Sequence, residues 1–504
     1  MVAQPEEKLA RGKTAMQALD AEIDTAPIPA VQNHGARRGE AERRNPIGRE
    51  ESRNRIVAFI PVYNGMDCIG KAIHGLLAQS RRPDLIVIIA NGCRDATAMV
   101  AREFTNARDS FGDPCVTVLE LPRLPNKKSE ALNEAWHRHG YDADIIVCCD
   151  DDTLLPPFAV EHWERELMVN PRLGGSSSQP VMTGTGFLAR TQRSEFSKSA
   201  ELSLRRGWCR VISGTGCAYR VAALKEVASD DGAPGPWTYL SVVEDYHLTY
   251  QLRSHGWLAE MSPTVYVYTG AMHSVKSLWA QRIKWQTGTV ADLIRFGINR
   301  LNWREWGQQG FGLACICFWS LWLCLITTEL AVYGLRLVTV SWLYFPIAFS
   351  VIELLHCRKI HGRTPLDWFL AGSLIQIFGY TFLSMGWIIA SWYKAVTDSQ
   401  KDMWEAQYKL DGTVAADESM TEGIGHAMKG MAGVEARRRW LVGGILLVFA
   451  GAVLGLSAAT GLAVYGVLPH FYISATRDLL LAITVGTMTM AVLELFPKIK
   501  IRRR

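Results

Sequence analysis

The sequence predicts an α/β fold with a doubly wound, mainly parallel sheet, followed by an α-helical transmembrane region. In the first half of the chain, short apolar segments rich in β-branched residues alternate with stretches of helical periodicity, which is typical of parallel sheets. After residue 308, long apolar stretches follow one another and several carry tryptophan. The net charge of +5 is modest, and Lys and Arg are not clustered as in nucleic-acid-binding proteins. No nucleic-acid partner is therefore expected.

Strands and helices of the sheet region alternate along the chain. The first strand begins at Ile56 and is stopped by Pro61 and a turn, and the fourth ends where three aspartates begin. Strands are expected at 56–60, 85–90, 116–121 and 145–149, and helices at 68–79, 96–104 and 129–139. Beyond the aspartates, a Gly-rich turn into a strand is expected at 213–220, and helices at 246–255, 277–296 and, on the membrane interface, 299–306.

Composition divides the chain into six parts. Residues 1–54 carry scattered charge and few large apolar side chains, which predicts a disordered tail. The remaining parts are the sheet domain (55–276), amphipathic interface helices (277–308), transmembrane helices (309–397), a cytoplasmic or interfacial linker (398–439), and further transmembrane helices with a basic C-terminus (440–504).

Five apolar stretches are candidates for membrane segments. They cover 311–335, 341–355, 366–393, 441–468 and 479–496. A buried soluble bundle would explain any one of them, but five with tryptophan at their edges favour an integral membrane protein with membrane lipid as a partner. The basic residues that flank these stretches all look cytoplasmic, so 366–393 cannot be a simple single span. It is expected to be re-entrant or to lie at the interface.

The cysteines and the N-terminus indicate a cytosolic sheet domain. Eleven cysteines, an odd number without a Cys-x-x-Cys pair, suit buried free thiols in a reducing compartment. No secretory signal is visible at the polar N-terminus. We therefore expect a protein of the plasma or inner membrane whose sheet domain is cytoplasmic.

Three consecutive carboxylates, Asp150, Asp151 and Asp152, follow the fourth strand. Carboxylates crowded at a strand edge repel one another unless a cation lies among them. Mg²⁺ or Mn²⁺ is expected, because both prefer oxygen ligands and commonly hold a substrate phosphate as well. Open α/β sheets also bind their ligands at this edge. For an isolated triplet, a solvated acidic turn is the alternative.

Five further motifs stand in order around this triplet. They are Ile60-Pro61-Val62-Tyr63-Asn64, Asn91-Gly92-Cys93-Arg94-Asp95, Lys128-Ser129-Glu130-Ala131-Leu132-Asn133, Val243-Glu244-Asp245 continuing to Gly256-Trp257, and Gln281-Arg282-Ile283-Lys284-Trp285. Together they resemble the family 2 glycosyltransferases with a GT-A fold. Within that family the chain looks most like the membrane-integrated group of cellulose, chitin and hyaluronan synthases, and the resemblance covers roughly 55–288.

The resemblance implies a site for a nucleoside-diphosphate sugar, expected to be UDP-linked. It assigns Asp152 to the metal, Asp150 to the nucleotide, and Lys128 to positive charge near the diphosphate at a helix start. The other donor-binding residues that it implies are Pro61, Tyr63, Asn64, Asn91, Asp95, Arg282 and Lys284. Lys284 stands where the family has Arg, which keeps the charge but loses the bidentate fork for phosphate. Many members carry Asp where Asn91 stands.

The same resemblance implies the catalytic and acceptor residues. A sugar hydroxyl is a poor nucleophile near neutral pH, so a base must take its proton, and Asp245 matches the family's base. Glu244 is expected to orient the acceptor or that base. Gln281 and Trp285 share one helix face with Lys284, and the resemblance places this pair at the acceptor.

Two enzyme functions are compatible with these motifs. The chain either extends a polysaccharide at the membrane, with export as an option, or adds one sugar to a lipid or protein acceptor. The Gln281–Trp285 motif favours the first, whereas Lys284 in place of Arg and the ambiguous 366–393 stretch favour the second. A non-catalytic membrane scaffold is a third option, which the full set of acidic residues disfavours.

Overall fold

The computed structural model describes residues 54–109, 112–333, 344–373 and 375–397. The predicted tail up to residue 53, the linker at 398–439 and the apolar stretches at 441–468 and 479–496 lie outside the described residues. The predictions for those segments therefore stay predictions.

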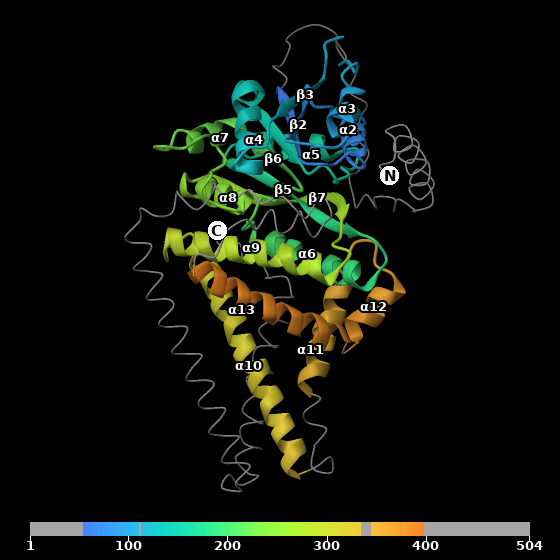
Figure 1. The fold of residues 1–504 in the computed structure, drawn as a ribbon, viewed down its shortest axis with the longest axis vertical. Helices are drawn as coiled ribbons and strands as arrows, with labels where there is room; N and C mark the ends of the chain where they lie inside the picture. The colour runs from blue at the N-terminus through green and yellow to red at the C-terminus, as the bar shows by residue number, and fades with distance from the viewer. Residues whose placement is uncertain (1–53, 110–111, 334–343, 374, 398–504) are drawn as a thin grey trace, which may run out of the picture. The chain divides into compact units, whose positions relative to one another are not determined.

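One seven-stranded sheet organises the first half of the described chain (Figure 1). Its strand order is β3-β2-β1-β4-β6-β5-β7. The strands are β1 (Ile56–Val62), β2 (Leu85–Asn91), β3 (Val116–Leu121), β4 (Ile145–Cys149), β5 (Leu173–Thr183), β6 (Gly216–Arg220) and β7 (Leu258–Gly270). The four strands predicted before the aspartates are confirmed, two of them with the predicted bounds. Pro61 does not stop the first strand as predicted, because the pairing of β1 with β2 continues through Pro61 to Val62.

The sheet is mixed, with β6 antiparallel to both β4 and β5. The pairs β1–β2, β1–β4, β2–β3 and β5–β7 are parallel, as a mainly parallel sheet requires. Because Cys149 at the end of β4 pairs with Gly216 at the start of β6, the turn before β6 lies at the same edge as the aspartates. The reversed strand therefore brings the Gly-rich turn to the ligand-binding edge.

Helices cover both faces of the sheet, as the doubly wound prediction requires. One hydrophobic cluster with the sheet contains α2 (Ile69–Leu77), α3 (Thr97–Arg102) and α5 (Ala159–Val169). The other contains α4 (Lys127–Ala135), α7 (Val221–Ala228) and α8 (Glu244–Ser254). Between these layers all five residues of β4 are buried, which explains why that strand is apolar throughout rather than alternating.

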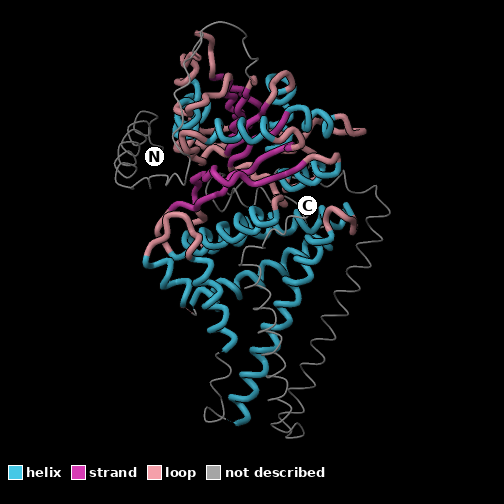
Figure 2. Tube along the Cα trace, turned by 180° about the vertical axis from the view of Figure 1, so that it is seen from behind, coloured by secondary structure: helices cyan, strands magenta, loops and turns pink. Residues whose placement is uncertain are grey.

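Most of the rest of the described chain is helical (Figure 2), and besides a π-helix at Gln376–Tyr380 it contains six longer or later α-helices. They are α6 (Phe187–Arg206), α9 (Val275–Phe296), α10 (Trp303–Tyr333), α11 (Tyr344–Cys357), α12 (Pro365–Gly372) and α13 (Thr381–Thr397). Helices α9 and α13 pack along each other, with Ile283 against Trp387 and, further along, Val290 and Ile294 in one cluster with Trp392.

Ion pairs connect α6 to the α11–α12 region. Arg190 lies 2.9 Å from Asp367, Lys198 lies 2.5 Å from Glu353, and Lys359 pairs with Glu201. The Asp367 carboxylate is almost completely buried, and it also accepts hydrogen bonds from Thr364 that cap α12. This part of the chain is therefore held against α6 largely by charge.

One prediction for the apolar half was wrong in detail. The interface helix expected at 299–306 and the apolar stretch after it form one continuous helix, α10, which begins at Trp303. The stretch 366–393 is interrupted, in agreement with the expectation that it is not a simple single span: α12 ends at Gly372 with Ser373 extended, and α13 begins at Thr381. Within the described ranges, no helix combines the length and the apolarity needed to cross a bilayer.

Candidate active site

The three aspartates after β4 point to three different partners. Asp150 Oδ1 lies 2.8 Å from Lys128 Nζ, and Asp151 Oδ2 accepts a hydrogen bond of 3.4 Å from the Cys68 thiol. Asp152 accepts hydrogen bonds of 3.2 Å from the Thr269 hydroxyl near the end of β7. One acidic run therefore contributes to three separate sets of contacts.

Asp151 is turned away from the open edge and toward the loop after β1. A Cβ atom on Gly65 would lie 2.2 Å from Asp151 Oδ2, so only glycine fits beside this carboxylate. Burial, together with the charges of Asp152 and Asp150, raises the pKa of Asp151 to about 7. These contacts suit an internal role for Asp151.

Asp152 is the exposed member of the triplet and the best placed to hold a metal ion. Burial of its surroundings and the charge of Asp150 raise its pKa, which a bound cation would reverse. The described residues contain no cluster of three or more carboxylate, imidazole or thiolate groups that could hold a metal. One carboxylate with a hydroxyl beside it fits Mg²⁺ or Mn²⁺ of the kind held jointly by protein and substrate phosphate.

Lys128, at the start of α4, is the cation of the acidic cluster. Its Nζ atom lies 2.8 Å from Asp150 Oδ1 and 3.3 Å from Glu244 Oε1. Burial alone would lower its pKa, but the charges of Asp150, Glu244 and Asp245 raise it well above the ordinary value. Lys128 is therefore charged at any pH at which the protein would work.

Asp245, in the first turn of α8, is held by a backbone donor. The amide of Gly214 donates a hydrogen bond of 2.8 Å to its Oδ2 atom. A Cβ atom at position 214 would lie 2.9 Å from both Asp245 Oδ2 and Lys128 Nζ, so a side chain there would separate these groups. Burial and the neighbouring Glu244 raise the pKa of Asp245 to about 7, which is the range expected of a general base.

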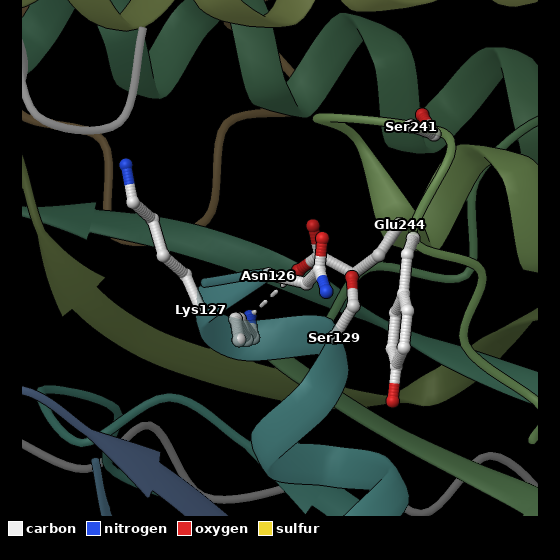
Figure 3. A pocket seen from close by; sticks show the side chains of 7 residues that line it. Asn126, Lys127, Ser129, Ser241 and Glu244 are labelled. Atoms are coloured by element: carbon white, nitrogen blue, oxygen red, sulfur yellow. Dashed lines mark ion pairs between the residues drawn. The ribbon is translucent and has the colours of Figure 1, made fainter. Parts of the chain in front are cut away.

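A pocket opens beside this cluster, between the start of α4 and the segment before α8. Figure 3 shows this pocket, with Asn126 and Ser129 facing Glu244. The dashed line marks the ion pair between Lys128 and Glu244. Its lining residues are Asn126, Lys127, Lys128, Ser129, Tyr239, Ser241 and Glu244. Lys128 and Glu244 of the acidic cluster therefore line this pocket.

The residues of the expected nucleotide site mostly hold one another. Asn91 uses its amide within the protein: its nitrogen donates to the Lys127 carbonyl, and its oxygen accepts from the Leu124 amide, each at 3.1 Å. Asp95 accepts hydrogen bonds from the Met66 and Thr97 amides. The contacts of these two side chains favour a role in shaping the loops, and their direct contact with a nucleotide stays a prediction.

The first motif also has a definite place at this edge. Pro61 lies within β1 and is partly exposed. Asn64 adopts a left-handed backbone conformation, with φ of 54°, and its side-chain oxygen accepts a hydrogen bond from the Arg94 amide. The Arg123 guanidinium lies 5.5 Å from the centre of the Tyr63 ring. These contacts join the loops after β1, β2 and β3.

The helix with the Gln281–Trp285 motif, α9, packs directly behind the acidic cluster. A Cβ atom on Gly288 would lie 2.8 Å from Val242 and Val243, the residues immediately before Glu244. Lys284, one turn before Gly288, is buried. The helix that carries this motif therefore fixes the segment from which Glu244 and Asp245 project.

Arg282 has partners other than the expected diphosphate. Its guanidinium lies 2.9 Å from Glu195 on α6 and 4.7 Å from the centre of the Trp285 ring, and it donates to Gln281 at 2.6 Å. Tyr380 donates to the same Glu195 carboxylate. This geometry makes Arg282 a link among α6, α9 and the segment before α13, and its donor role stays a prediction.

Sequence reasoning missed Gly214 and Thr269 as members of the site. The run Ser213-Gly214-Thr215-Gly216 stood out as a Gly-rich turn, but its contact with Asp245 depends on the antiparallel β6. No local signal marked Thr269, because β7 itself was not predicted.

A family model described as "Glycosyltransferase like family 2" matches residues 54–288 of this chain. Residues 54–288 form a family 2 glycosyltransferase domain. The match ends within α9 and includes the acidic triplet, Asp245 and the Gln281–Trp285 motif.

Curated relatives of this glycosyltransferase are 22–23% identical to it over the aligned residues. A poly-beta-1,6-N-acetyl-D-glucosamine synthase of Staphylococcus epidermidis is 23% identical over 336 residues, which cover 65% of this chain and 71% of the relative. A synthase of the same description from Staphylococcus aureus (strain MSSA476) is 23% identical over 245 residues, or 48% of this chain and 56% of the relative.

Solved structures that are similar to part of the chain were also found. A mannosyltransferase from Pyrobaculum calidifontis, in complex with GDP-Man and Mn²⁺, is 18% identical, with a TM-score of 0.44 over 69% of this chain and 88% of that one. Glucosyl-3-phosphoglycerate synthase from Mycobacterium tuberculosis is 19% identical, with a TM-score of 0.33 over 48% and 79%.

Proposed function

We propose that this protein is an inverting glycosyltransferase that moves a sugar from a nucleoside-diphosphate sugar to a growing polysaccharide at a membrane. The observation that carries the proposal is the geometry around Asp245. Its carboxylate is fixed by the Gly214 amide, lies beside Lys128, and has a pKa raised to about 7. Lys128 and the neighbouring Glu244 line a pocket, and Asp152 is exposed just after the end of β4.

In this proposal the chain's own side chains divide the work of a single displacement. Asp245 accepts the proton of the attacking hydroxyl as that hydroxyl bonds to the anomeric carbon. Lys128 balances the charge of Asp150 and Glu244 and so keeps the acidic cluster compact. Asp152, with Thr269 beside it, would hold Mg²⁺ or Mn²⁺, which neutralises charge on a leaving diphosphate when bound.

The acceptor and donor follow from similarity to the curated relatives. Those relatives are described as poly-beta-1,6-N-acetyl-D-glucosamine synthases, and the first covers 65% of this chain. The Gln281–Trp285 motif, with its resemblance to processive synthases, supports a polymer as product. We therefore propose a UDP-linked sugar as donor, with UDP-N-acetylglucosamine the first to test, and a carbohydrate chain as acceptor.

We also propose that the later helices lie in or against a lipid bilayer, with the catalytic domain on the cytoplasmic side. The support is a set of large apolar side chains that are exposed on α10 to α13. They include Phe311, Leu330, Ile347, Val351, Phe369 and Ile389. Exposed apolar side chains in this number are costly in water and favourable in lipid.

The test is a product assay with the full-length protein in detergent or liposomes. Radiolabelled UDP-N-acetylglucosamine and Mn²⁺ are supplied, and products are sized by gel filtration and digested with a β-1,6-specific hexosaminidase. We expect a polymer that is absent from an Asp245→Asn preparation. A product bearing one added sugar on lipid would replace the polymerase proposal with single transfer, and no UDP release from any common UDP-sugar would reject both.

A further inference from the structure

Asp292, on α9, lies at the centre of a buried polar network beneath the catalytic segment. It is 1% exposed and accepts hydrogen bonds from three directions. Ser241 Oγ donates to its Oδ2 atom at 2.7 Å, His247 Nδ1 lies 3.2 Å from the same atom, and Arg295 pairs with Oδ1. Burial alone would raise the pKa of Asp292, but His247 and Arg295 hold it below the ordinary value.

Two of the three partners of Asp292, Ser241 and Arg295, also bond to the loop that leads into α8. Ser241 Oγ accepts a hydrogen bond of 3.1 Å from the Val243 amide, and Arg295 donates at 2.7 Å to the Leu240 carbonyl. The His247 amide donates to the Val243 carbonyl in the first turn of α8. The loop 240–243 is therefore fixed at both ends by contacts that converge on Asp292.

The catalytic pair follows this loop directly. Glu244 and Asp245 are the first two residues of α8, and α8 has no side-chain cap at its N-terminus. Its start is defined instead by Ser241, which bonds both to Asp292 and to the backbone just ahead of the helix. A shift of this loop would move Asp245 away from the Gly214 amide and from Lys128.

We propose that Asp292 is a positioning residue for the transfer reaction, which holds the loop 240–243 and through it sets the place of Asp245. The inference rests on the proposed function, because it concerns how the proposed base is held. It adds that α9 carries, on one helix, both the Gln281–Trp285 motif and the residue that orients the base. Asp292 is not itself in contact with substrate in this proposal.

The experiment compares four variants of the full-length protein with UDP-sugars and Mn²⁺. Ser241→Ala removes the hydrogen bond between the loop and Asp292, and Ser241→Thr keeps a hydroxyl at position 241. Asp292→Asn removes the negative charge of Asp292. Ser176→Ala is the matched control, since Ser176 is also buried and donates at 2.6 Å to Glu166, and neither of these residues lines the pocket. The readouts are kcat, donor KM, donor Kd by calorimetry, and Tm.

We expect Ser241→Ala and Asp292→Asn to lower kcat by about 10- to 100-fold, the loss typical of a reacting group displaced by about 1 Å. Donor Kd should stay within about twofold, and Ser241→Thr should recover most of the rate. Ser176→Ala should lower Tm without lowering kcat. This separation of kcat from donor affinity is one that mere loss of stability does not produce.

Several outcomes would overturn the inference. They are an unchanged kcat in Ser241→Ala or in folded Asp292→Asn, a loss of donor affinity equal to the loss of kcat, or an equal loss in Ser176→Ala. If Asp292→Asn does not fold, the Ser241→Ala and Ser241→Thr pair decides alone. If the wild-type protein releases no UDP from any donor, the proposed function fails and the inference fails with it. If the wild type is active and the variants match it, only the inference fails.

Discussion

Replacing Lys128 with Met tests whether this cation sets the protonation of the proposed base. Lys128 Nζ and Asp245 Oδ2 each lie 2.9 Å from the position of a Cβ on Gly214, so they are at most about 6 Å apart. At an effective dielectric constant of about 20, unit charges about 6 Å apart attract by about 3 kcal/mol, which corresponds to about two pH units. Loss of Lys128 should raise the pKa of Asp245 from about 7 toward about 9.

The consequence is a displaced pH profile. Asp245 acts as a base only when deprotonated, so kcat should rise with pH through its pKa in both proteins. The midpoint should lie near pH 7 for wild type and about two units higher for Lys128→Met. At pH 7 the variant should be slower by about 50-fold, and near pH 10 the two should converge.

The assay measures UDP release at saturating donor from pH 5.5 to 10, with Lys225→Met as the control. Lys225 lies over the Tyr141 ring, so its loss removes one charge without touching the acidic cluster. An equal loss of rate at every pH, with the midpoint still near 7, would refute the reasoning. It would indicate that Lys128 acts on the donor rather than on Asp245.

Three further predictions follow from the site and its surroundings. Asp245→Asn should lower kcat by about 10²- to 10⁴-fold while donor Kd stays within about twofold, since only the proton acceptor is lost; calorimetry with UDP and initial rates would check this, and loss of donor binding would count against the assignment. Asp152→Asn should raise the Mn²⁺ concentration needed for half-maximal rate more than tenfold. Asp151→Asn should raise it far less, because the Asp151 carboxylate faces Cys68. A larger effect of Asp151→Asn in metal titrations would contradict the assignment of Asp152 to the metal. Glu195→Gln should lower the free energy of unfolding by about 1–3 kcal/mol, because the buried Arg282 loses its carboxylate partner. Adding Arg282→Met should recover part of this loss. Strictly additive effects of the two substitutions in denaturant titrations would exclude coupling between Glu195 and Arg282.

The sequence predicted β2 and β4 well because these strands are buried on both faces. The continuous apolar runs at 85–90 and 145–149 leave no competing pattern, and each became a strand. Strand β3 was predicted as well, although Thr117 and Glu120 interrupt its apolar run and only Val116 and Leu119 are buried. Strand β5 was missed although eight consecutive residues of it are buried. Its core consists of Gly174, Gly175 and three serines, whose small size admits Ile212 and Trp257, so burial there comes from neighbours rather than from the strand's own hydrophobicity.

The site was predicted in its residues but not in its contacts. The motifs marked Lys128, Asp150, Glu244 and Asp245, and the structure brings these four side chains into one cluster. Their mutual distances depend on the antiparallel β6, which no local pattern specifies. Likewise, the sequence did not indicate a role for Asp292, because a single acidic residue in a helix cannot be assigned a partner before the loop that packs onto it is known.

The charged attachment of α6 has a practical consequence for dissecting the protein. A shortened chain that ended after α9 would keep Arg190, Lys198 and Glu201 while losing Asp367, Glu353 and Lys359. The same fragment would expose Ile283, Val290 and Ile294 of α9, which pack against Trp387 and Trp392 of α13, and would be prone to aggregate. A catalytic fragment for crystallisation should therefore extend through Thr397.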